Sequence, residues 1–346
     1  MSGRSPSPPT RYDASRDDLR ALLTGEPAYR LRQVWDGLHA LREPAEMTDL
    51  PAPLRHRLAE ALPAALEPVT TSVSDGGDTV KWLWRLPDGA LVESVLMHYA
   101  TRTTVCVSTQ AGCAMACGFC ATGQAGFERN LSAGEIVEQV VRAARTGQES
   151  GRRLGNVVFM GMGEPLANYD RVWAAVRRLH DDLGISARHL TLSTVGVVPG
   201  IRRLAGEDLP VNLAVSLHAA NDGLRDELVP INRRYPLAEL IAACREYLDA
   251  KGRRLSIEWA LIAGVNDRDR DAAELAAIAR SLAAHVNLIP LNPTAEYDTP
   301  GSPPARVRTF RELLRSLGVN ATVRQNRGTS IDAACGQLRA VAVELG

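Results

Sequence analysis

The segment GCAMACGFC, residues 112–120, places three cysteines within eight positions: Cys113, Cys117 and Cys120. Three thiols at this spacing do not complete a structural zinc site, which takes four ligands, and they cannot all be paired in disulfides. Iron–sulfur cubanes are normally held by four thiolates. A cubane held by three would keep one iron open, as catalytic metals keep a position for a substrate or cofactor. The pattern therefore favours an iron–sulfur cluster with an open iron.

Zinc remains an alternative for these cysteines, because Cys106 or His98 could supply a fourth ligand. Disulfides are not expected, since thiols stay reduced in the cytosol. Simple burial does not fit either, because the segment is rich in glycine and resembles a loop more than an apolar helix face. Cys244, in contrast, shares a helical face with Leu240 and Leu248, so we expect it to be a core residue.

Short apolar runs alternate with helical stretches after the cysteine segment. The strand candidates are NVVFMGMG, HLTLSTVG, VNLAVSLHA, LSIEWALIAG, VNLIPLNP and NATVRQN. Helices are predicted from Ser132, where SAGE is a capping box, and at about 169–183, 236–250, 267–284 and 304–317. Such alternation is typical of parallel strands with right-handed crossovers. We therefore predict an α/β protein in which about six units close into a full or partial barrel.

The predicted strands end in small or polar residues. These ends are Gly161–Pro165, Ser193–Gly196, Ser216–His218 and Asn292–Pro293. Glycine and serine at a single strand end would indicate only a turn. Because the carboxyl ends of parallel strands meet at one edge of the sheet, four such ends predict a ligand site there.

The chain divides into five predicted segments. Residues 1–16 are polar and contain several prolines and serines, which predicts a disordered tail. Residues 17–75 are predicted to form short helices separated by prolines, which together make a small accessory domain. Residues 76–98 are predicted to form a hairpin linker that turns at a Pro-Asp-Gly sequence. Residues 99–330 form the predicted barrel, and 331–346 form a C-terminal segment that contains the last cysteine.

Composition narrows the class of protein. The chain of 346 residues has 40 basic and 40 acidic residues, so its formal net charge is zero. Zero net charge argues against a protein whose whole surface binds nucleic acid, although pairs such as Arg202–Arg203 and Arg233–Arg234 gather charge locally. The N-terminus lacks the apolar core of a secretory signal, and no run approaches the roughly 18 apolar residues of a membrane span. We expect a cytoplasmic protein without membrane contact.

Together these motifs resemble the RlmN family, radical S-adenosylmethionine (SAM) enzymes that methylate C2 of adenine in 23S rRNA and tRNA. The C-x₃-C-x₂-C pattern after the first strand of an α/β barrel is similar to the cluster motif of the radical SAM superfamily. The segments that carry the resemblance are CVSTQAGCAMACGFCATG, FMGMGEPLANYD, LTLSTVGVVPGI, AVSLHAANDGLRDELVPINRRYP, NLIPLNP and RGTSIDAACGQL. It extends from about Tyr29 to about Leu338 and implies a partial (β/α)6 radical SAM barrel with a small N-terminal helical accessory domain that binds RNA.

The resemblance implies a [4Fe–4S] cluster on Cys113, Cys117 and Cys120, whose open iron holds the amino and carboxylate groups of SAM. It also implies that Cys335 takes a methyl group from one SAM and that a second SAM yields a 5′-deoxyadenosyl radical. This radical removes a hydrogen from the methylated sulfur, and the carbon radical adds to C2, which is too electron-poor to attack SAM directly. Cys106 then releases the base and forms a transient disulfide with Cys335. Taken alone, either of these last two cysteines would be an ordinary buried residue.

The resemblance also assigns residues around the cofactor. Those expected to contact SAM are Gly163, Glu164, Ser193, Ser216, Leu217, His218 and Asn292. Glycine lets the backbone approach a ligand closely, and a carboxylate can pair with the SAM ammonium. A purely structural role is the alternative for His218. Glu93 falls where the family has a proton acceptor, and an exposed hairpin carboxylate is the alternative there.

Two alternatives stay open for the function. A sister class that methylates adenine C8 in rRNA and confers antibiotic resistance shares the cysteine signatures, although the proline of GMGEP and the RG before TSIDAACGQL favour the C2 enzymes. A non-catalytic, metal-containing RNA-binding protein would have no use for thiols at Cys106 and Cys335. The expected partners are 23S rRNA, tRNA and an electron-donor protein such as flavodoxin or ferredoxin, and we expect a monomer.

Overall fold

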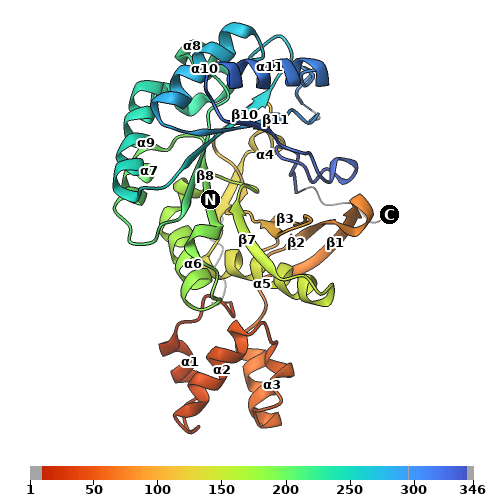
Figure 1. Ribbon diagram of the computed structural model, residues 1–346. Coiled ribbons are helices and arrows are strands. Elements are labelled where there is room, and N and C mark those ends of the chain that lie inside the picture. Colours follow the sequence, from red (N-terminus) through yellow and green to blue (C-terminus); the bar gives the residue numbers. More distant parts are fainter. Residues whose placement is uncertain (1–9, 295, 341–346) are drawn as a thin grey trace.

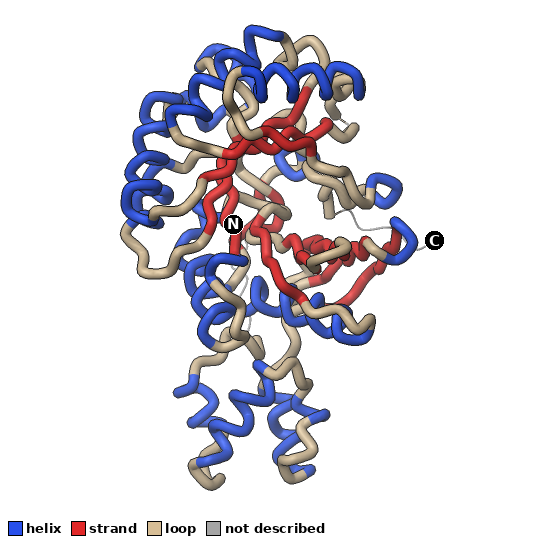
Figure 2. Tube along the Cα trace, viewed as in Figure 1, coloured by secondary structure: helices blue, strands red, loops and turns tan. Residues whose placement is uncertain are grey.

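A curved sheet of ten strands forms a partial barrel, with helices along its outer face (Figure 1 and Figure 2). The computed structural model describes residues 10–294 and 296–340. The strands lie in the order β1 (Glu67–Ser74), β2 (Thr79–Arg85), β3 (Leu91–His98), β4 (Thr103–Cys106), β7 (Leu154–Phe159), β8 (Leu190–Thr194), β9 (Asn212–Ser216), β10 (Leu255–Leu261), β11 (His285–Pro290) and β12 (Ala321–Val323). Neighbouring strands pair antiparallel from β1 to β4 and parallel from β4 to β12.

Helices connect the parallel strands, as strand–helix alternation in the sequence predicts. They are α5 (Ala133–Glu149), α6 (Tyr169–Asp181), α7 (Val198–Ala205), α8 (Asp222–Leu228), α9 (Leu237–Lys251), α10 (Asp269–Ser281) and α11 (Pro304–Ser316). Short 3₁₀ turns are η1 (Pro44–Glu46), η2 (Asp75–Gly77), η3 (Pro165–Asn168), η4 (Ala187–His189), η5 (Pro230–Arg233) and η6 (Thr329–Ile331). The six predicted strands are β7 to β12, and β4 precedes them. The α/β partial-barrel prediction is confirmed.

Local sequence signals explain how these elements begin and pack. The Glu135 amide donates to Ser132 Oγ at 3.1 Å and the Ser132 amide donates to Glu135 Oε2 at 2.8 Å, which confirms the capping box at the start of α5. In the core, the fully buried Trp259 of β10 stacks on Phe310 of α11 with ring centroids 6.3 Å apart. Cys244 of α9 is also buried in the core, as predicted.

The N-terminal segment before the first helix is part of the fold. Tyr12 is only 2% exposed, and the Arg178 guanidinium of α6 donates to the carbonyl oxygens of three successive residues of this segment. The predicted disordered tail over residues 1–16 is therefore wrong for residues 10–16. One buried aromatic ring and three hydrogen bonds from a half-buried guanidinium outweigh the polar composition of this segment. Residues 1–9 lie outside the described residues.

Three helices form a separate group below the barrel in Figure 1: α1 (Arg16–Leu22), α2 (Tyr29–His39) and α3 (Ala52–Ala61). We call this group the N-terminal helical unit. It is attached to the barrel helices, since Trp35 Nε1 donates to Asp182 at 3.1 Å and Arg145 pairs with Glu46 at 2.7 Å. No helix among the described residues is long and apolar enough to cross a bilayer.

The boundary predicted at residue 75 is also corrected. Residues 67–74, EPVTTSVS, form β1 and pair with β2, so the predicted hairpin over 76–98 is a three-stranded antiparallel meander over 67–98. Valine and threonine favour the extended backbone of this edge strand. The side chains of β1 are mostly exposed, so its sequence contains no apolar run. For this reason the sequence does not indicate that a strand begins after the last helix of the N-terminal helical unit.

Asp13 should stabilise the whole domain. Its carboxylate accepts hydrogen bonds from Ser132 Oγ at 2.8 Å and from the Gly134 amide at 2.7 Å, both at the start of α5. We expect Asp13→Ala to lower the free energy of unfolding by about 1–2 kcal/mol, the usual cost of removing such a cap. Urea unfolding measures the change. The matched control is Asp17→Ala, which removes only an exposed ion pair with Arg20 and should cost less than about 0.5 kcal/mol. Equal destabilisation of the two variants would show that residues 10–16 do not anchor α5.

Candidate active site

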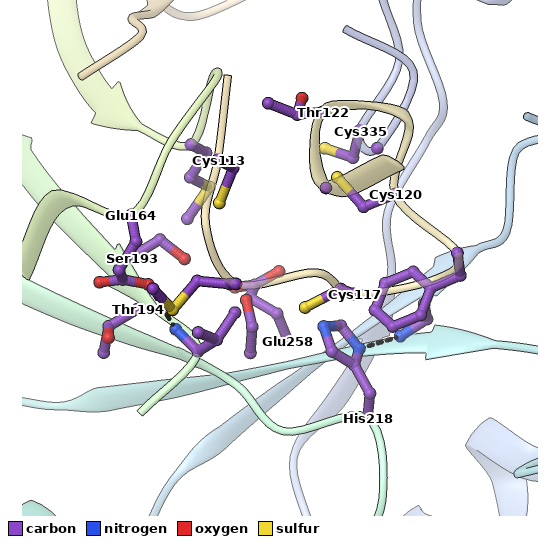
Figure 3. A pocket seen from close by; sticks show the side chains of 18 of the residues that line it. Cys113, Cys117, Cys120, Thr122, Glu164, Ser193, Thr194, His218, Glu258 and Cys335 are labelled. Atoms are coloured by element: carbon purple, nitrogen blue, oxygen red, sulfur yellow. Dashed lines mark hydrogen bonds between the residues drawn. The ribbon is translucent and has the colours of Figure 1, made fainter. Parts of the chain in front are cut away.

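A cavity open to solvent lies at the carboxyl ends of the parallel strands (Figure 3). The ends or following loops of β7 to β11 contribute to its wall, together with the cysteine loop and the C-terminal segment. This is the edge at which the strand-end residues predicted a ligand site. The cavity lining includes the cysteines Cys113, Cys117, Cys120 and Cys335.

The cysteine loop lies between two short strands, β5 (Gln110–Gly112) and β6 (Phe127–Asn130), and contains the short helix α4 (Ala121–Gln124). Gly112 has a φ of +73°, and a Cβ atom there would lie 2.0 Å from the Gly126 carbonyl oxygen, so only glycine fits. The Cys120 amide donates to the Cys117 carbonyl at 3.1 Å, which folds the loop back on itself. A glycine-rich sequence is thus what lets three cysteines line one cavity.

The three thiols fit a cluster. Burial raises the pKa of Cys113 to about 12, and it also raises the pKa of Cys117, where the neighbouring Cys120 and Cys113 add to the effect. Such thiols ionise when bound iron replaces their protons. Among the described residues, no three metal-ligating side chains converge on a single-ion site. The sulfurs that hold a cubane bind different irons and need not converge on one point.

Glu164 presents a carboxylate to the cavity from the loop after β7. It is 2% exposed, and burial raises its pKa to about 7. Its oxygens accept hydrogen bonds from the backbone amides of Leu166 at 3.0 Å and Val195 at 2.9 Å. Gly163 before it has a φ of +98°, and a Cβ atom there would lie 2.5 Å from Gln110. The carboxylate is thereby fixed where it can accept a ligand's ammonium group.

His218 is a neutral hydrogen-bond donor. Its Nδ1 atom accepts from the Ala260 amide at 3.0 Å, so the ring proton is on Nε2. Burial, and then the positive charge of Arg225, lower its pKa to about 3. The edge of its ring packs against Phe119 with centroids 4.8 Å apart. His218 therefore accepts a hydrogen bond from a strand amide, the structural role that the sequence left open, and it also lines the cavity, so its contact with SAM stays a prediction.

Five of the seven residues expected to contact SAM line this cavity: Gly163, Glu164, Ser193, Ser216 and His218. Leu217 and Asn292 are not among its lining residues. Leu217 is buried, and its amide donates to the Glu258 carbonyl at 3.0 Å. The Asn292 side-chain amide donates to the Cys335 carbonyl at 3.1 Å. Asn292 thus holds the backbone of the last cysteine.

Cys106 and Cys335 line a second, smaller cavity, which shares part of its wall with the first. Cys335 and Cys120 line both cavities, and Figure 3 shows their side chains close together. Burial raises the pKa of Cys106 to about 12, and the nearby Cys335 adds to this effect. The fold therefore brings together two cysteines that are far apart in the sequence, at the wall between two cavities.

Sequence reasoning missed two charged residues of the site. Glu258 is buried within the apolar strand β10 and lines the first cavity, where its Oε1 atom accepts from Asn287 Nδ2 at 2.8 Å. Its Oε2 atom has no hydrogen-bond partner among the described residues, and Arg324 Nη1 lies 3.8 Å away. Arg324 lines both cavities. An acidic residue inside an apolar run, LSIEWAL, was the available signal for Glu258.

Glu93 lies elsewhere. It is 4% exposed, which corrects the alternative of an exposed hairpin carboxylate. It lines a third cavity, with Lys81, Asp332 and Arg339, and is absent from the described lining of both cavities that contain Cys335. Burial raises its pKa, and a hydrogen bond from Lys81 opposes this rise.

Comparison with known proteins agrees with this geometry. Residues 107–276 match the family model of the radical SAM superfamily. Proteins described as probable dual-specificity RNA methyltransferase RlmN are 57% identical in Parafrankia sp., covering 98% of this chain and 94% of the relative, and 55% identical in Salinispora tropica, covering 94% and 91%. A crystal structure of a radical SAM methyltransferase from Sphaerobacter thermophilus is 51% identical, with a TM-score of 0.93 over 96% of this chain and 100% of that chain. This chain belongs to the RlmN family of radical SAM enzymes.

Proposed function

We propose that this protein methylates C2 of adenine in RNA, with Cys335 as the carrier of the methyl group. The observation that supports this most directly is the place of Cys335. It lines the cavity of Cys113, Cys117 and Cys120, and also the cavity of Cys106. A residue that takes a methyl group in one cavity and delivers it in the other needs access to both cavities.

Adenine C2 is electron-poor and does not attack the methyl group of SAM, so its methylation needs radical chemistry. When bound, the [4Fe–4S] cluster and SAM supply the electron and the 5′-deoxyadenosyl radical for it. Three parts of the site would bind these cofactors: the cysteine loop holds the cluster, Glu164 accepts the SAM ammonium, and the Nε2–H of His218 donates to an acceptor in the cavity. The Cys335 sulfur loses its proton as it takes the methyl group. To release the base, the Cys106 thiolate would bond to the Cys335 sulfur while the bond from that sulfur to the methylene carbon breaks. The carbon would take up a proton to become the methyl group, the C2 hydrogen would leave as a proton, and the unpaired electron of the adduct would return to the bound cluster.

The substrates and the electron donor follow from the same proposal. The relatives are named dual-specificity RNA methyltransferases, which supports 23S rRNA and tRNA as the two substrates of this chain. Reduction of the cluster calls for a small electron-transfer protein such as flavodoxin or ferredoxin. Both the cluster and the free thiols need a reducing compartment, which supports a cytoplasmic location.

Replacement of Cys113, Cys117 or Cys120 by alanine should abolish the cluster. Protein purified without oxygen should contain iron and sulfide and show visible absorbance, and each variant should lose the absorbance and the cleavage of SAM, because two thiolates cannot hold the cubane. Iron and sulfide analysis measures this. Cys244→Ala is the control, since that thiol is buried in α9 and does not line the cavity. Stoichiometric zinc without iron in the parent protein would refute the cluster.

Cys106→Ala should trap the enzyme on its RNA. The variant should bind the cluster and accept a methyl group on Cys335, because position 106 lies outside the cysteine loop, but no thiol would then release the base. After nuclease digestion, mass spectrometry should find Cys335 linked through a methylene group to adenosine. Cys335→Ala should give neither adduct nor product. Normal turnover of Cys106→Ala to free 2-methyladenosine would remove Cys106 from the mechanism.

The N-terminal helical unit should bind RNA through its exposed arginines. The side chains of Arg20 and Arg32 are 65% and 85% exposed. Replacing both by glutamine should weaken RNA binding and reduce the slope of log affinity against log salt by about one for each phosphate group that is no longer neutralised. The control is Arg308→Gln on α11, an exposed arginine at the other end of the molecule. If the Arg20/Arg32 double variant and the Arg308→Gln control both bind RNA as the parent does, the helical unit is not part of the RNA site.

A further inference from the structure

The segment that carries Cys335 has little regular structure of its own. We call residues 328–340 the C-terminal strap; after the 3₁₀ turn η6 it is irregular up to its last described residue. From α4, the Ala121 amide donates to the Gly336 carbonyl at 2.8 Å and Thr122 Oγ1 donates to the Leu338 carbonyl at 2.6 Å. Because the strap has no strand pairing, the position of Cys335 depends on such individual hydrogen bonds and on the packing of Ala333 and Leu338 into the core.

Two charged residues of the meander hold the strap on both sides of Cys335. Glu93 of β3 accepts a hydrogen bond from the Arg339 amide through Oε2, at 2.9 Å. Its Oε1 atom lies 2.9 Å from Lys81 Nζ of β2, and the same ammonium group donates to the Asp332 carbonyl at 3.3 Å. One buried ion pair thereby fixes the backbone three residues before and four residues after Cys335.

The ion pair is costly to bury and is placed on a rigid support. The Lys81 and Glu93 side chains are 14% and 5% exposed, and a buried pair of charges gains little net stability. The two residues lie on neighbouring antiparallel strands, and Ser108 Oγ donates to the Glu93 carbonyl at 2.6 Å. A costly pair that stands on a fixed sheet and binds an irregular segment is the arrangement expected of a positioning device.

We propose that Lys81 and Glu93 form a latch that positions Cys335 through the strap, in place of a proton-accepting role for Glu93 at the RNA base. This inference rests on the proposed function, in which Cys335 takes the methyl group. Both Glu93 oxygens already have partners, and the residue lines a different cavity from Cys106 and Cys335. A general base needs hydrogen-bond reach to the proton that it removes.

The two roles act at different steps. A latch acts before RNA binds, because Cys335 must face the SAM cavity to take its methyl group. A base at adenine acts only after the bond between the methylene carbon and C2 has formed. Methylation of Cys335 in the absence of RNA therefore separates the two roles.

The experiment uses the cluster-loaded full chain with SAM and without RNA, and compares Glu93→Ala and Lys81→Met with the parent. Hydrogen exchange of peptides covering residues 332–340 reports on the strap, and mass spectrometry follows methylation of Cys335. We expect exchange about tenfold faster and methylation about tenfold slower in each variant, the effect of removing a hydrogen bond to a charged group. The double variant should be worse than either single variant but by less than the product of their effects, because each residue holds its own anchor and the two also contact each other.

The matched control is Glu67→Gln. It removes an ion pair with Arg85 on the same meander, at 3.2 Å, that does not involve the strap, and it should leave exchange and methylation unchanged. Exchange of peptides from β7 to β9 verifies that each variant is folded. If Glu93→Ala does not fold, Lys81→Met alone decides, since it leaves the Glu93–Arg339 hydrogen bond in place and removes the one to Asp332.

Two results would overturn the latch. Parent-like strap exchange and Cys335 methylation, with loss only of RNA product, would place Glu93 at the RNA base. Parent-like behaviour in every assay would leave the pair without a role. If the parent itself never methylates Cys335, the proposed function fails, and the exchange data still show whether Lys81 and Glu93 hold the strap.

Discussion

The proposed chemistry depends on the position of one sulfur, that of Cys335. It must reach the cavity of the cysteine loop and also the cavity of Cys106, and it lines both. The barrel provides the cavity walls, but the strap that carries Cys335 has no strand or helix to fix it. Single hydrogen bonds with α4, with Asn292 and with the β2–β3 pair hold it, together with the burial of Ala333 and Leu338 in the core. Weakening any of these bonds should therefore have a large effect on the chemistry.

Burial sets the electrostatics of the site. It holds His218 neutral, raises the pKa of Glu164 to about 7 and keeps the thiols of Cys106 and Cys113 protonated in the absence of iron. A cavity with little free charge binds a charged cofactor through a few fixed partners. Arg324 is the exception: a cation that lines both cavities, near Glu258 and the thiols of Cys106 and Cys335.

Much of this site could be predicted from the sequence, because its signals are local. The cysteine spacing, the capping box at Ser132 and the small residues at the strand ends each lie within a few positions. The features that the sequence did not predict depend on contacts between distant parts of the chain. Arg324 and Glu258 meet only because β10 and β12 flank β11, and Glu93 bonds to the Arg339 amide, which lies 246 residues later in the chain. The order of residues 10–16 likewise depends on Arg178, a residue of α6.

In the proposed reaction, the methyl group reaches RNA through Cys335. The most direct measurement loads the enzyme with isotope-labelled SAM in the absence of RNA, removes the free SAM, and then adds RNA with unlabelled SAM. Mass spectrometry should find the label first on Cys335 and, after one turnover, in the methyl group at adenine C2. A first-turnover methyl group that comes only from the unlabelled SAM would contradict the account.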